Sequence, residues 1–411
     1  MSTPVKARSL NDWLVLLEGL NMAHIELGLT RMQTVAERLN LLSLPSYVIT
    51  VGGTNGKGTT CALLEAMLSA GGVSVGVYSS PHLVDYRERV RIKGHSPAAA
   101  HFCAAFAEVE AARGDIALTY FEFTTLAALW LFRDAAPEVV LLEVGLGGRL
   151  DATNVVASDQ SVITTIALDH TDWLGDNRES VGFEKAGIFR AANAAVCGDA
   201  KPPASLLAYA EQLATPLYCT GRDYQWQVQG DAWSFRGLGL DLEQLPLPSL
   251  PVMNAATALA TLALSPFTLS KEAILTGLSQ AQLNGRLQQL SPNLWIDVAH
   301  NAESATYLAT QLSKLKGERR CIAVVGMLKD KDIAASLAPL QPLVDTWYLA
   351  SLAGPRGASA SELAGYQAGG EFDSVIAALT AAQHHADEHD MIIVFGSFFT
   401  VADVLAHFQR L

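Results

Sequence analysis

The chain lacks several features that would place it in other classes of protein. It has no uninterrupted apolar run of about 20 residues, so no transmembrane helix is expected, and Asp12 and Glu18 interrupt the apolar core that a signal peptide would need. Its five cysteines include no C-x-x-C pair, which favours reduced thiols in the cytoplasm. It has no block of basic residues and a formal net charge of −13, so nucleic acid is not an expected partner.

What remains is the composition of a globular protein. The 411 residues are 50% hydrophobic and 17% charged, and this length predicts two or three domains. In so acidic a chain, an anionic substrate must be held by a local basic patch. If residues 87–91 form a strand, Arg87, Arg89 and Arg91 lie on one face and are candidates for that patch, while a solvated edge strand is the alternative. No heptad or swapped-arm pattern occurs, so we expect a monomer.

Apolar strand patterns alternate with helical patterns along the chain, which predicts an α/β protein with parallel sheets covered on both faces. Strands are predicted at 47–51, 73–78, 139–144, 162–167 and 194–197, and helices at 10–20, 30–42, 97–112, 123–132 and 254–264, with a connector at 240–251. A second alternation has strands at 294–298, 321–325, 346–350 and 391–395 and helices at 300–315, 332–340, 372–384 and 401–408. We therefore predict two domains, 1–287 and 288–411.

The most informative segment is the string GGTNGKGTT at residues 52–60. It joins a predicted buried strand to a predicted helix that ends at Gly71. Backbone N–H groups of such a loop converge, the helix dipole adds partial positive charge, and Lys57 adds a full charge. The segment predicts a binding site for a nucleotide phosphate.

The loop departs from the standard P-loop pattern, which would require glycine at position 51 and a hydroxyl at position 58. These positions hold Val51 and Gly58, and hydroxyls follow at Thr59 and Thr60. The string instead resembles the ATP-binding loop of the Mur ligase superfamily, in its folylpolyglutamate and dihydrofolate synthase branch. The resemblance implies a P-loop ATPase domain of the Mur ligase type, followed by a smaller Rossmann-like domain.

Polar residues follow three of the predicted strands, where ligands of α/β sheets collect. They are Ser80 after the second strand, Glu143 at the end of the third, and Asp169 and His170 after the fourth. A hydroxyl, a carboxylate and an imidazole beside a phosphate loop suit Mg²⁺ with a nucleotide, although imidazole is an unusual ligand for this ion.

Five further strings resemble signatures of the same family and occur in the family's order. They are SPHL at 80–83, LEVGLGGRLDATN at 142–154, DHT at 169–171, EKAGI at 184–188 and DVAHN at 297–301. The resemblance implies that Ser80, Glu143 and His170 are magnesium ligands, and that Lys185 is carbamylated and helps to hold a second Mg²⁺. From the residues alone, Lys185 would be a solvated helix lysine. Ala302 departs from the proline that often follows DVAHN.

The resemblance also implies contacts with the substrates. For ATP they are Asn55, Gly56, Lys57, Gly58, Thr59, Asn254, Arg286 and Asp297, with Lys57, Lys185, Arg286 and His300 as catalytic groups. The pteroate-binding segments would be Glu26, Leu27 and Gly28; Thr119, Tyr120, Phe121 and Glu122; and Leu150, Asp151 and Ala152. From the sequence of the second domain, our own candidates for positioning L-glutamate are Lys329, Asp330, Lys331 and Asp332, Arg356 in its GPRG string, and Gly396 with Ser397, and plain surface loops are the alternative for all three.

The implied activity is an ATP-dependent ligation of L-glutamate to dihydropteroate and to the glutamate tail of reduced folates. A monofunctional folylpolyglutamate synthase is the first alternative. A peptidoglycan-precursor ligase of the same superfamily would carry a further domain ahead of the ATP domain, and the loop at residue 52 leaves no room for it. A nucleotide switch without ligase chemistry would not need the second domain or the EKAGI element.

Overall fold

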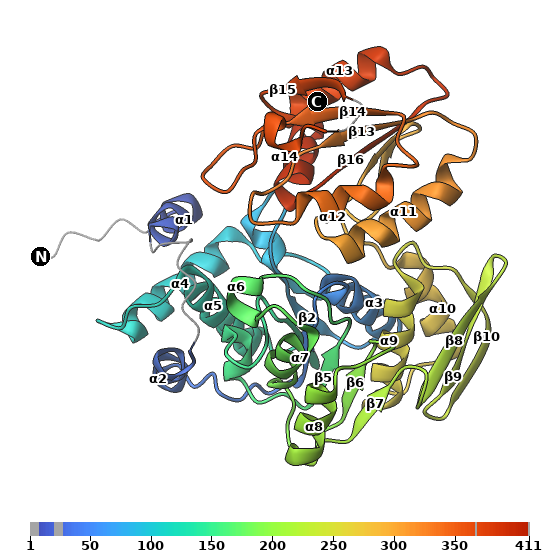
Figure 1. Cartoon of the computed structure of the whole chain (residues 1–411). Helices are drawn as coiled ribbons and strands as arrows, with labels where there is room; N and C mark the ends of the chain where they lie inside the picture. Colours follow the sequence, from blue (N-terminus) through green and yellow to red (C-terminus); the bar gives the residue numbers. More distant parts are fainter. Residues whose placement is uncertain (1–7, 20–27, 366–367, 410–411) are drawn as a thin grey trace, which may run out of the picture. The chain divides into compact units, whose positions relative to one another are not determined.

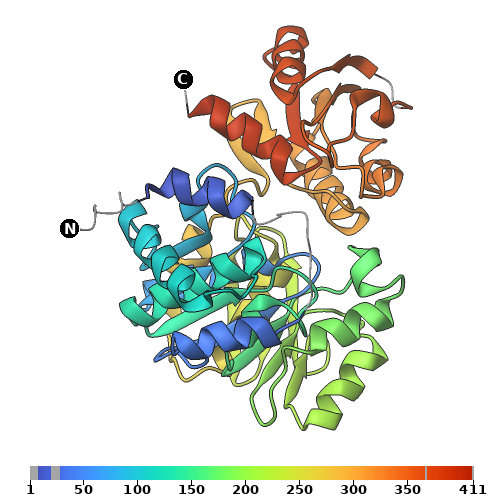
Figure 2. The same cartoon turned by 90° about the vertical axis from the view of Figure 1, so that its left-hand side faces the viewer.

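The computed structural model of the protein describes residues 8–19, 28–365 and 368–409 (Figures 1 and 2). Its contacts divide the chain into two compact units. The first unit comprises Met1–His82 and Arg87–Gln282, and the second comprises Leu83–Tyr86 and Leu283–Leu411. The sequence placed the domain boundary between residues 287 and 288 and gave no sign that residues 83–86 pack with the second unit.

The first unit is built on a seven-stranded sheet in the order β3-β2-β4-β1-β5-β6-β7. Neighbouring strands are parallel except at one edge, where β3 is antiparallel to β2. The strands are β1 Tyr47–Gly52, β2 Val75–Tyr78, β3 Val90–Ile92, β4 Val139–Glu143, β5 Gln160–Ile163, β6 Ala195–Cys197 and β7 Leu217–Cys219. The central strands are buried, as their apolar runs predict for a sheet covered on both faces.

Helices cover this sheet. Helices α3 (Lys57–Ala70) and α9 (Val252–Ala263) contact its central strands, and α7 (Arg178–Ala186) packs beside α8 (Ala204–Leu213), both green in Figure 2. The other helices and 3-10 turns described before residue 283 are α1 Leu10–Glu18, α2 Thr30–Arg38, α4 Ala99–Arg113, α5 Tyr120–Ala135, α6 Thr171–Leu174, α10 Lys271–Gln280, η1 Tyr86–Arg89 and η2 Ala152–Val155. Helix α1 begins with a capping box formed by Ser9 and Asp12.

Several boundaries differ from the sequence prediction. Helix α2 ends at Arg38 rather than near residue 42, and Asn40 has a left-handed backbone with φ 54°. Strand β5 ends at Ile163, because the residues that follow bind the phosphate loop. The segment 240–251 is not a plain connector: β8 (Tyr224–Gln229), β9 (Ala232–Gly237) and β10 (Leu240–Pro246) form a three-stranded antiparallel sheet. Most of β8 is exposed, so it lacks the apolar run of a buried strand.

The strand predicted at residues 87–91 is also wrong. Arg87 and Arg89 lie in the 3-10 turn η1, and of the three arginines only Arg91 lies in β3, so they do not share one strand face. Arg91 forms a 2.6 Å ion pair with Glu65 of α3. Arg89 is buried and donates a 2.9 Å hydrogen bond to Nδ1 of His82. The structure therefore ties two of the three proposed steering cations into contacts within the protein.

The second unit has a six-stranded sheet in the order β11-β12-β16-β13-β14-β15. Its elements are β11 Gln288–Ser291, β12 Leu294–Ile296, α11 Ala302–Lys316, β13 Cys321–Val325, α12 Ile333–Leu337, η3 Ala338–Leu340, β14 Thr346–Ala350, η4 Ala360–Leu363, β15 Ala368–Phe372, α13 Val375–His385, β16 Met391–Phe395 and α14 Phe398–Phe408. The sequence prediction lacked β11 and β15, but it gave β13, β14 and β16 with their observed bounds.

Alternate residues of β13 enter two different cores of the second unit. Cys321, Ala323 and Val325 pack with α11 and α12, whereas Ile322 and Val324 pack with α13 and α14. This arrangement confirms the α/β class with helices on both faces of a largely parallel sheet. Within the ranges that the structure describes, no helix is long and apolar enough to cross a membrane.

Candidate active site

The phosphate loop joins β1 to α3, and two of its glycines are required by their surroundings. Gly53 and Gly56 have φ values of 139° and 86°. A Cβ on Gly53 would overlap the hydroxyl of Thr164, and one on Gly56 would lie 2.6 Å from Oδ1 of Asn254. Only glycine combines this backbone with such close packing.

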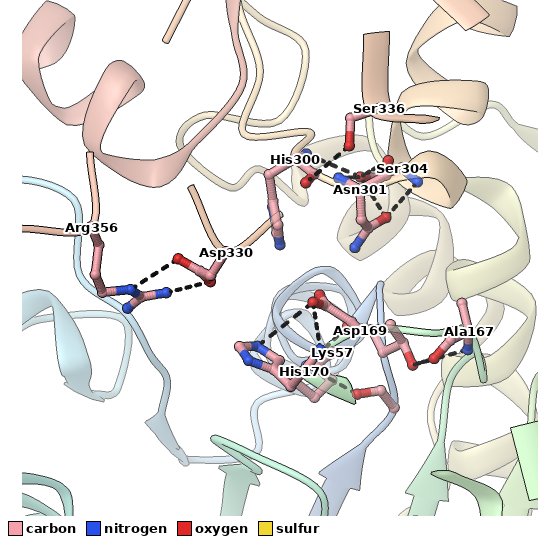
Figure 3. Close-up of polar contacts among 12 residues, drawn as sticks. Lys57, Ala167, Asp169, His170, His300, Asn301, Ser304, Asp330, Ser336 and Arg356 are labelled. Carbon is pink, nitrogen blue, oxygen red and sulfur yellow. Dashed lines mark hydrogen bonds and ion pairs between the residues drawn. The ribbon is translucent and has the colours of Figure 1, made fainter. Parts of the chain in front are cut away.

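The start of α3 is built to receive an anion. Gly56 is its N-cap residue and supplies no side-chain acceptor to the first-turn N–H groups. The Nζ group of Lys57 donates hydrogen bonds of 3.0 Å to the carbonyl oxygens of Gly53 and Thr54, so the ammonium lies against its own loop (Figure 3). Uncapped N–H groups, a helix dipole and an adjacent ammonium together form a phosphate-binding element.

Neighbouring strand ends hold the loop in place. The backbone N–H of Thr54 donates to the carbonyl of Thr165 at 2.7 Å, and the Thr54 hydroxyl both donates to the carbonyl and accepts from the N–H of Ala167 (Figure 3). The hydroxyl of Thr164 donates a 2.6 Å bond to the carbonyl of Asn55. The phosphate loop is thus fixed by the segment that leads to Asp169 and His170.

Two of the predicted metal ligands are in direct contact. The backbone N–H of Ser80 donates a 3.2 Å hydrogen bond to Oε2 of Glu143, whose side chain is buried at the end of β4. Among the described residues, no three His, Cys, Asp or Glu side chains form a group that could hold a metal ion. A metal site here therefore needs the Ser80 hydroxyl or Lys185 in addition to Glu143 and His170, and this ligand set stays a prediction.

Lys185 is not the solvated lysine that its helix position alone would suggest. It is 2% exposed, and helix α7, which carries it, packs against the 142–154 loop. Glu184 forms a 2.8 Å ion pair with Arg149, and a Cβ on Gly148 would lie 3.0 Å from the carbonyl oxygen of Lys185. The burial of Lys185 thus contradicts the solvated position that its helix pattern suggested.

His170 is more exposed to solvent than Lys185. Its side chain is 37% exposed, its backbone is left-handed with φ 51°, and it precedes the short helix α6. Its backbone N–H is held by a 2.8 Å hydrogen bond to Oδ1 of Asp169 (Figure 3). A left-handed backbone at a histidine is uncommon and marks the turn of the chain into α6.

Two of the predicted pteroate segments meet at Gly145. A Cβ there would lie 2.6 Å from Phe121 and 3.2 Å from the carboxylate of Asp151. Thr119 and Glu122 form the capping box of α5, and Asp151 accepts a 2.8 Å hydrogen bond from the N–H of Leu146. Burial raises the pKa of Asp151, although its hydrogen bonds act in the opposite direction.

The remaining described residues of the predicted pteroate segments are not among the closest contacts of a Cβ at Gly145. Tyr120 lies under the guanidinium of Arg89, which is 5.6 Å from its ring centroid. Leu150 and Ala152 flank Asp151. Glu26 and Leu27 lie outside the described residues, and Gly28 is the first residue described after that gap.

In the second unit, the DVAHN segment follows β12. Burial raises the pKa of the Asp297 carboxyl, and the nearby Arg286 acts against this shift. Asp297 accepts hydrogen bonds of 2.7 Å from the N–H groups of Leu287 and Ala299. Nδ1 of His300 lies 2.9 Å from the carbonyl oxygen of Val298, which fixes Nδ1 as the protonated nitrogen.

Phe398, at the start of α14, connects two of these groups. The guanidinium of Arg286 lies 5.1 Å from the centroid of its ring, and the ring of His300 lies 5.9 Å from it. Phe398 was not among the site residues predicted from the sequence. Its place directly after the Gly396-Ser397 candidate, at a strand end, was the available signal.

The candidates for glutamate binding are engaged in contacts within the second unit. Arg356 forms a 2.8 Å ion pair with Asp330 (Figure 3), and Asp332 caps α12. Ser397 is buried as the N-cap of α14, and the carbonyl of Gly326 leaves no space for a side chain at Gly396. Asp332 and Ser397 thus each cap a helix, and their part in glutamate binding stays a prediction.

Comparison with known proteins defines the class first. Residues 51–215 match the Mur ligase middle domain, and residues 285–398 match the Mur ligase, glutamate ligase domain. The chain is therefore built from the two domains of a Mur-type ligase.

Relatives across almost the whole length define the branch. The chain is 51% identical to the dihydrofolate synthase/folylpolyglutamate synthase of Escherichia coli (strain K12), over 98% of this chain and 96% of that protein. It superposes with a TM-score of 0.95 on E. coli FolC in complex with DHPP and ADP, at 49% identity, covering 99% of each chain. A bifunctional folylpolyglutamate synthase/dihydrofolate synthase with Mn, AMPPNP and L-glutamate bound gives a TM-score of 0.93 at 51% identity, covering 99% of this chain and 100% of the other. The chain belongs to the dihydrofolate synthase/folylpolyglutamate synthase family.

Proposed function

We propose that this protein is an ATP-dependent ligase that joins L-glutamate to dihydropteroate, forming dihydrofolate, and adds further glutamates to reduced folates. The observation that carries the proposal is the phosphate loop with its uncapped helix start, in a chain 51% identical to the E. coli enzyme over 98% of its length. The Ser80–Glu143 contact and the buried Lys185 support it.

The reaction needs activation because a carboxylate at neutral pH does not react with an amine. Transfer of the γ-phosphoryl group of ATP to a carboxylate oxygen of the pterin substrate gives an acyl phosphate and ADP. The amino nitrogen of L-glutamate then attacks the acyl carbon, the amide bond forms as phosphate leaves, and the nitrogen loses a proton. The protein's contribution is mainly positioning and charge neutralisation.

Residues of the first unit bind the nucleotide phosphates. Lys57 turns from the carbonyls of Gly53 and Thr54 towards the β,γ-phosphates, and the N–H groups of Gly58 and Thr59 donate to them. Asn55 and Asn254 complete the loop. Mg²⁺, when bound, neutralises phosphate charge, and Ser80, Glu143, His170 and carbamylated Lys185 are the residues that would hold it as two ions.

Residues of the second unit complete the set. Arg286 and Asp297 contact the nucleotide, and His300 assists at the γ-phosphate through Nε2, because Nδ1 is held by Val298. The second unit positions L-glutamate, and the Lys329–Lys331 segment with Arg356 stays the candidate region.

In the first unit, Phe121 and Tyr120 stack against the pterin ring, beside Asp151.

A turnover assay tests the proposal. Purified protein with Mg²⁺-ATP and L-glutamate should release ADP when either dihydropteroate or tetrahydrofolate is added. Turnover with tetrahydrofolate alone would reduce the protein to a folylpolyglutamate synthase. If neither pterin supports turnover in folded protein that binds ATP, the substrate assignment is wrong.

We further propose a cytoplasmic monomer whose partners are small molecules rather than nucleic acid or membrane, consistent with its free cysteines.

A further inference from the structure

Asp199 lies just beyond the carboxyl end of β6, and its side chain is nine-tenths buried. Its carboxylate accepts hydrogen bonds of 2.8 Å from the backbone N–H groups of Ile166 and Lys201. It also forms an ion pair of 2.9 Å with the guanidinium of Arg178. One carboxylate thus connects three segments of the first unit: the chain after β5, the chain after β6, and the start of α7.

The first of these segments leads to His170. Ile166 stands between Thr165, whose carbonyl accepts from the N–H of Thr54, and Ala167, whose N–H donates to the Thr54 hydroxyl. Strand β5 has already ended at Ile163, so strand pairing no longer fixes this backbone. The phosphate loop holds it through Thr54, and Asp199 holds it at Ile166.

The third of these segments, helix α7, carries Lys185. Arg178 is the first residue of α7, and Lys185 follows two helical turns later on the same side of the helix. A cation at a helix N-terminus is opposed by the helix dipole, and the Asp199 carboxylate offsets that effect. Arg178 also donates a 3.0 Å hydrogen bond to the carbonyl of Lys201, which fixes the helix start from a second point.

We infer that Asp199 is a positioning residue for the metal–nucleotide site: with Arg178 it sets the chain that carries His170 against the helix that carries Lys185. This inference rests on the proposed function, because it takes His170 and Lys185 as metal ligands. Neither Asp199 nor Arg178 touches the phosphate loop through its side chain in these contacts, so both act through other residues. Replacing a group that hydrogen-bonds directly to a metal ligand typically changes metal affinity by about 10–100-fold, and Asp199 acts one step further away, so we expect the lower end of that range.

The alternative is that Asp199 only stabilises the fold, and the neighbouring strand provides a matched control. Asp223 follows β7, accepts a 2.6 Å hydrogen bond from the N–H of Cys219, and forms a 2.8 Å ion pair with Arg222. It therefore has the same chemistry as Asp199, but its partners belong to no predicted site segment. Asp199→Asn and Asp223→Asn make the same chemical change in the two places.

The first measurement is Mn²⁺ binding in the presence of ADP, followed by the electron paramagnetic resonance signal of free Mn²⁺, with no folate present. We expect Asp199→Asn to weaken Mn²⁺ binding by about 10-fold, while Asp223→Asn binds as the wild type does. The second measurement is hydrogen exchange without metal or nucleotide. The peptide containing Ile166 and Ala167 should exchange faster in Asp199→Asn and unchanged in Asp223→Asn.

Arg178→Gln keeps the carboxylate with its two backbone hydrogen bonds and removes only the tether to α7. It serves as the deciding variant if Asp199→Asn does not fold, and it should also weaken Mn²⁺ binding. Unchanged Mn²⁺ affinity in the folded variants would overturn the inference, as would a wild-type protein that binds no Mn²⁺ with ADP. Mn²⁺ binding without pterin turnover would instead overturn the substrate assignment and leave the role of Asp199 to be decided by the binding data.

Discussion

The side-chain amide of Asn254 donates a 2.6 Å hydrogen bond to the hydroxyl of Thr59, across a sequence separation of 195 residues. Thr59 in turn donates a 2.8 Å hydrogen bond to the carbonyl of Gly56, and both side chains are buried. Helix α9 therefore supports the phosphate loop from a distant part of the sequence.

Replacing Asn254 should weaken nucleotide binding. Asn254→Ala leaves the buried Thr59 hydroxyl without its donor, which costs about 1–3 kcal/mol, so we expect ADP affinity to fall roughly tenfold or more. Isothermal titration with Mg²⁺-ADP measures this. Thr261→Ala is the control, because the Thr261 hydroxyl donates to the carbonyl of Thr257 within α9, away from the phosphate loop. Wild-type ADP affinity in Asn254→Ala would contradict the prediction.

Gly56→Ala should abolish tight nucleotide binding in a protein that still folds. The alanine would need a left-handed backbone at φ 86°, and its Cβ would lie 2.6 Å from Asn254. Gly72→Ala is the control, since Gly72 has φ 80° and no atom within 4 Å of the added Cβ. Both variants should lose about 1 kcal/mol of stability from backbone strain. Equal ADP affinities of the two variants would show that the contact with Asn254 does not matter.

Lys185→Ala should lower ligase turnover by roughly 100-fold or more. The buried position of Lys185 suits a carbamate that helps to bind metal. Nuclear magnetic resonance of protein supplied with ¹³C-bicarbonate should show a carbamate carbon in the wild type and lose it in Lys185→Ala. Lys271→Ala, at an exposed position of α10, is the control for turnover and for the carbamate signal. Full turnover of Lys185→Ala would refute the role.

The Asp330–Arg356 pair predicts a pH dependence of stability. Burial raises the pKa of Asp330, but the Arg356 hydrogen bond and charge outweigh it, so the net pKa is below its ordinary value of 3.8. The contribution is therefore present above pH 3.8 and is lost as pH falls through the lower folded-state pKa. Because both side chains are largely exposed, the pair contributes less than about 1 kcal/mol.

Urea unfolding of the wild type and Asp330→Asn measures this contribution. The difference in unfolding free energy should be largest near pH 6 and should shrink towards pH 3. A difference that grows on acidification would contradict the assignment.

The sequence predicted the parts of the structure that depend on buried, local patterns. Strands β13, β14 and β16 were found with their observed bounds because every one of them is an apolar run entering two cores. The β8–β10 sheet was missed because exposed strands carry no such run. Three-dimensional context also decided the burial of Lys185, which its helix position had suggested to be solvated.

In the candidate site, too, local sequence patterns were predictable and contacts between distant residues were not. The glycines of the phosphate loop were recognisable as a string, because backbone conformation restricts which residues are allowed there. Asp199 and Phe398 could not be recognised, because their importance arises from partners distant in sequence, such as Ile166 and Arg286. The prediction that the three arginines share one strand face was wrong because the chain there forms a 3-10 turn before β3 begins.

Leu83 and Val84, which follow β2 of the first unit, pack against the core of the second unit formed by β12, β16, α13 and α14. The polypeptide therefore passes between the units before residue 87 as well as near residue 282. A fragment consisting of residues 283–411 would lack Leu83 and Val84, which cover part of its core. A fragment ending at residue 282 would keep these two apolar residues without the core that they pack against. Chimaeras that exchange the glutamate ligase domain between relatives should therefore transfer the 83–86 tetrapeptide together with it.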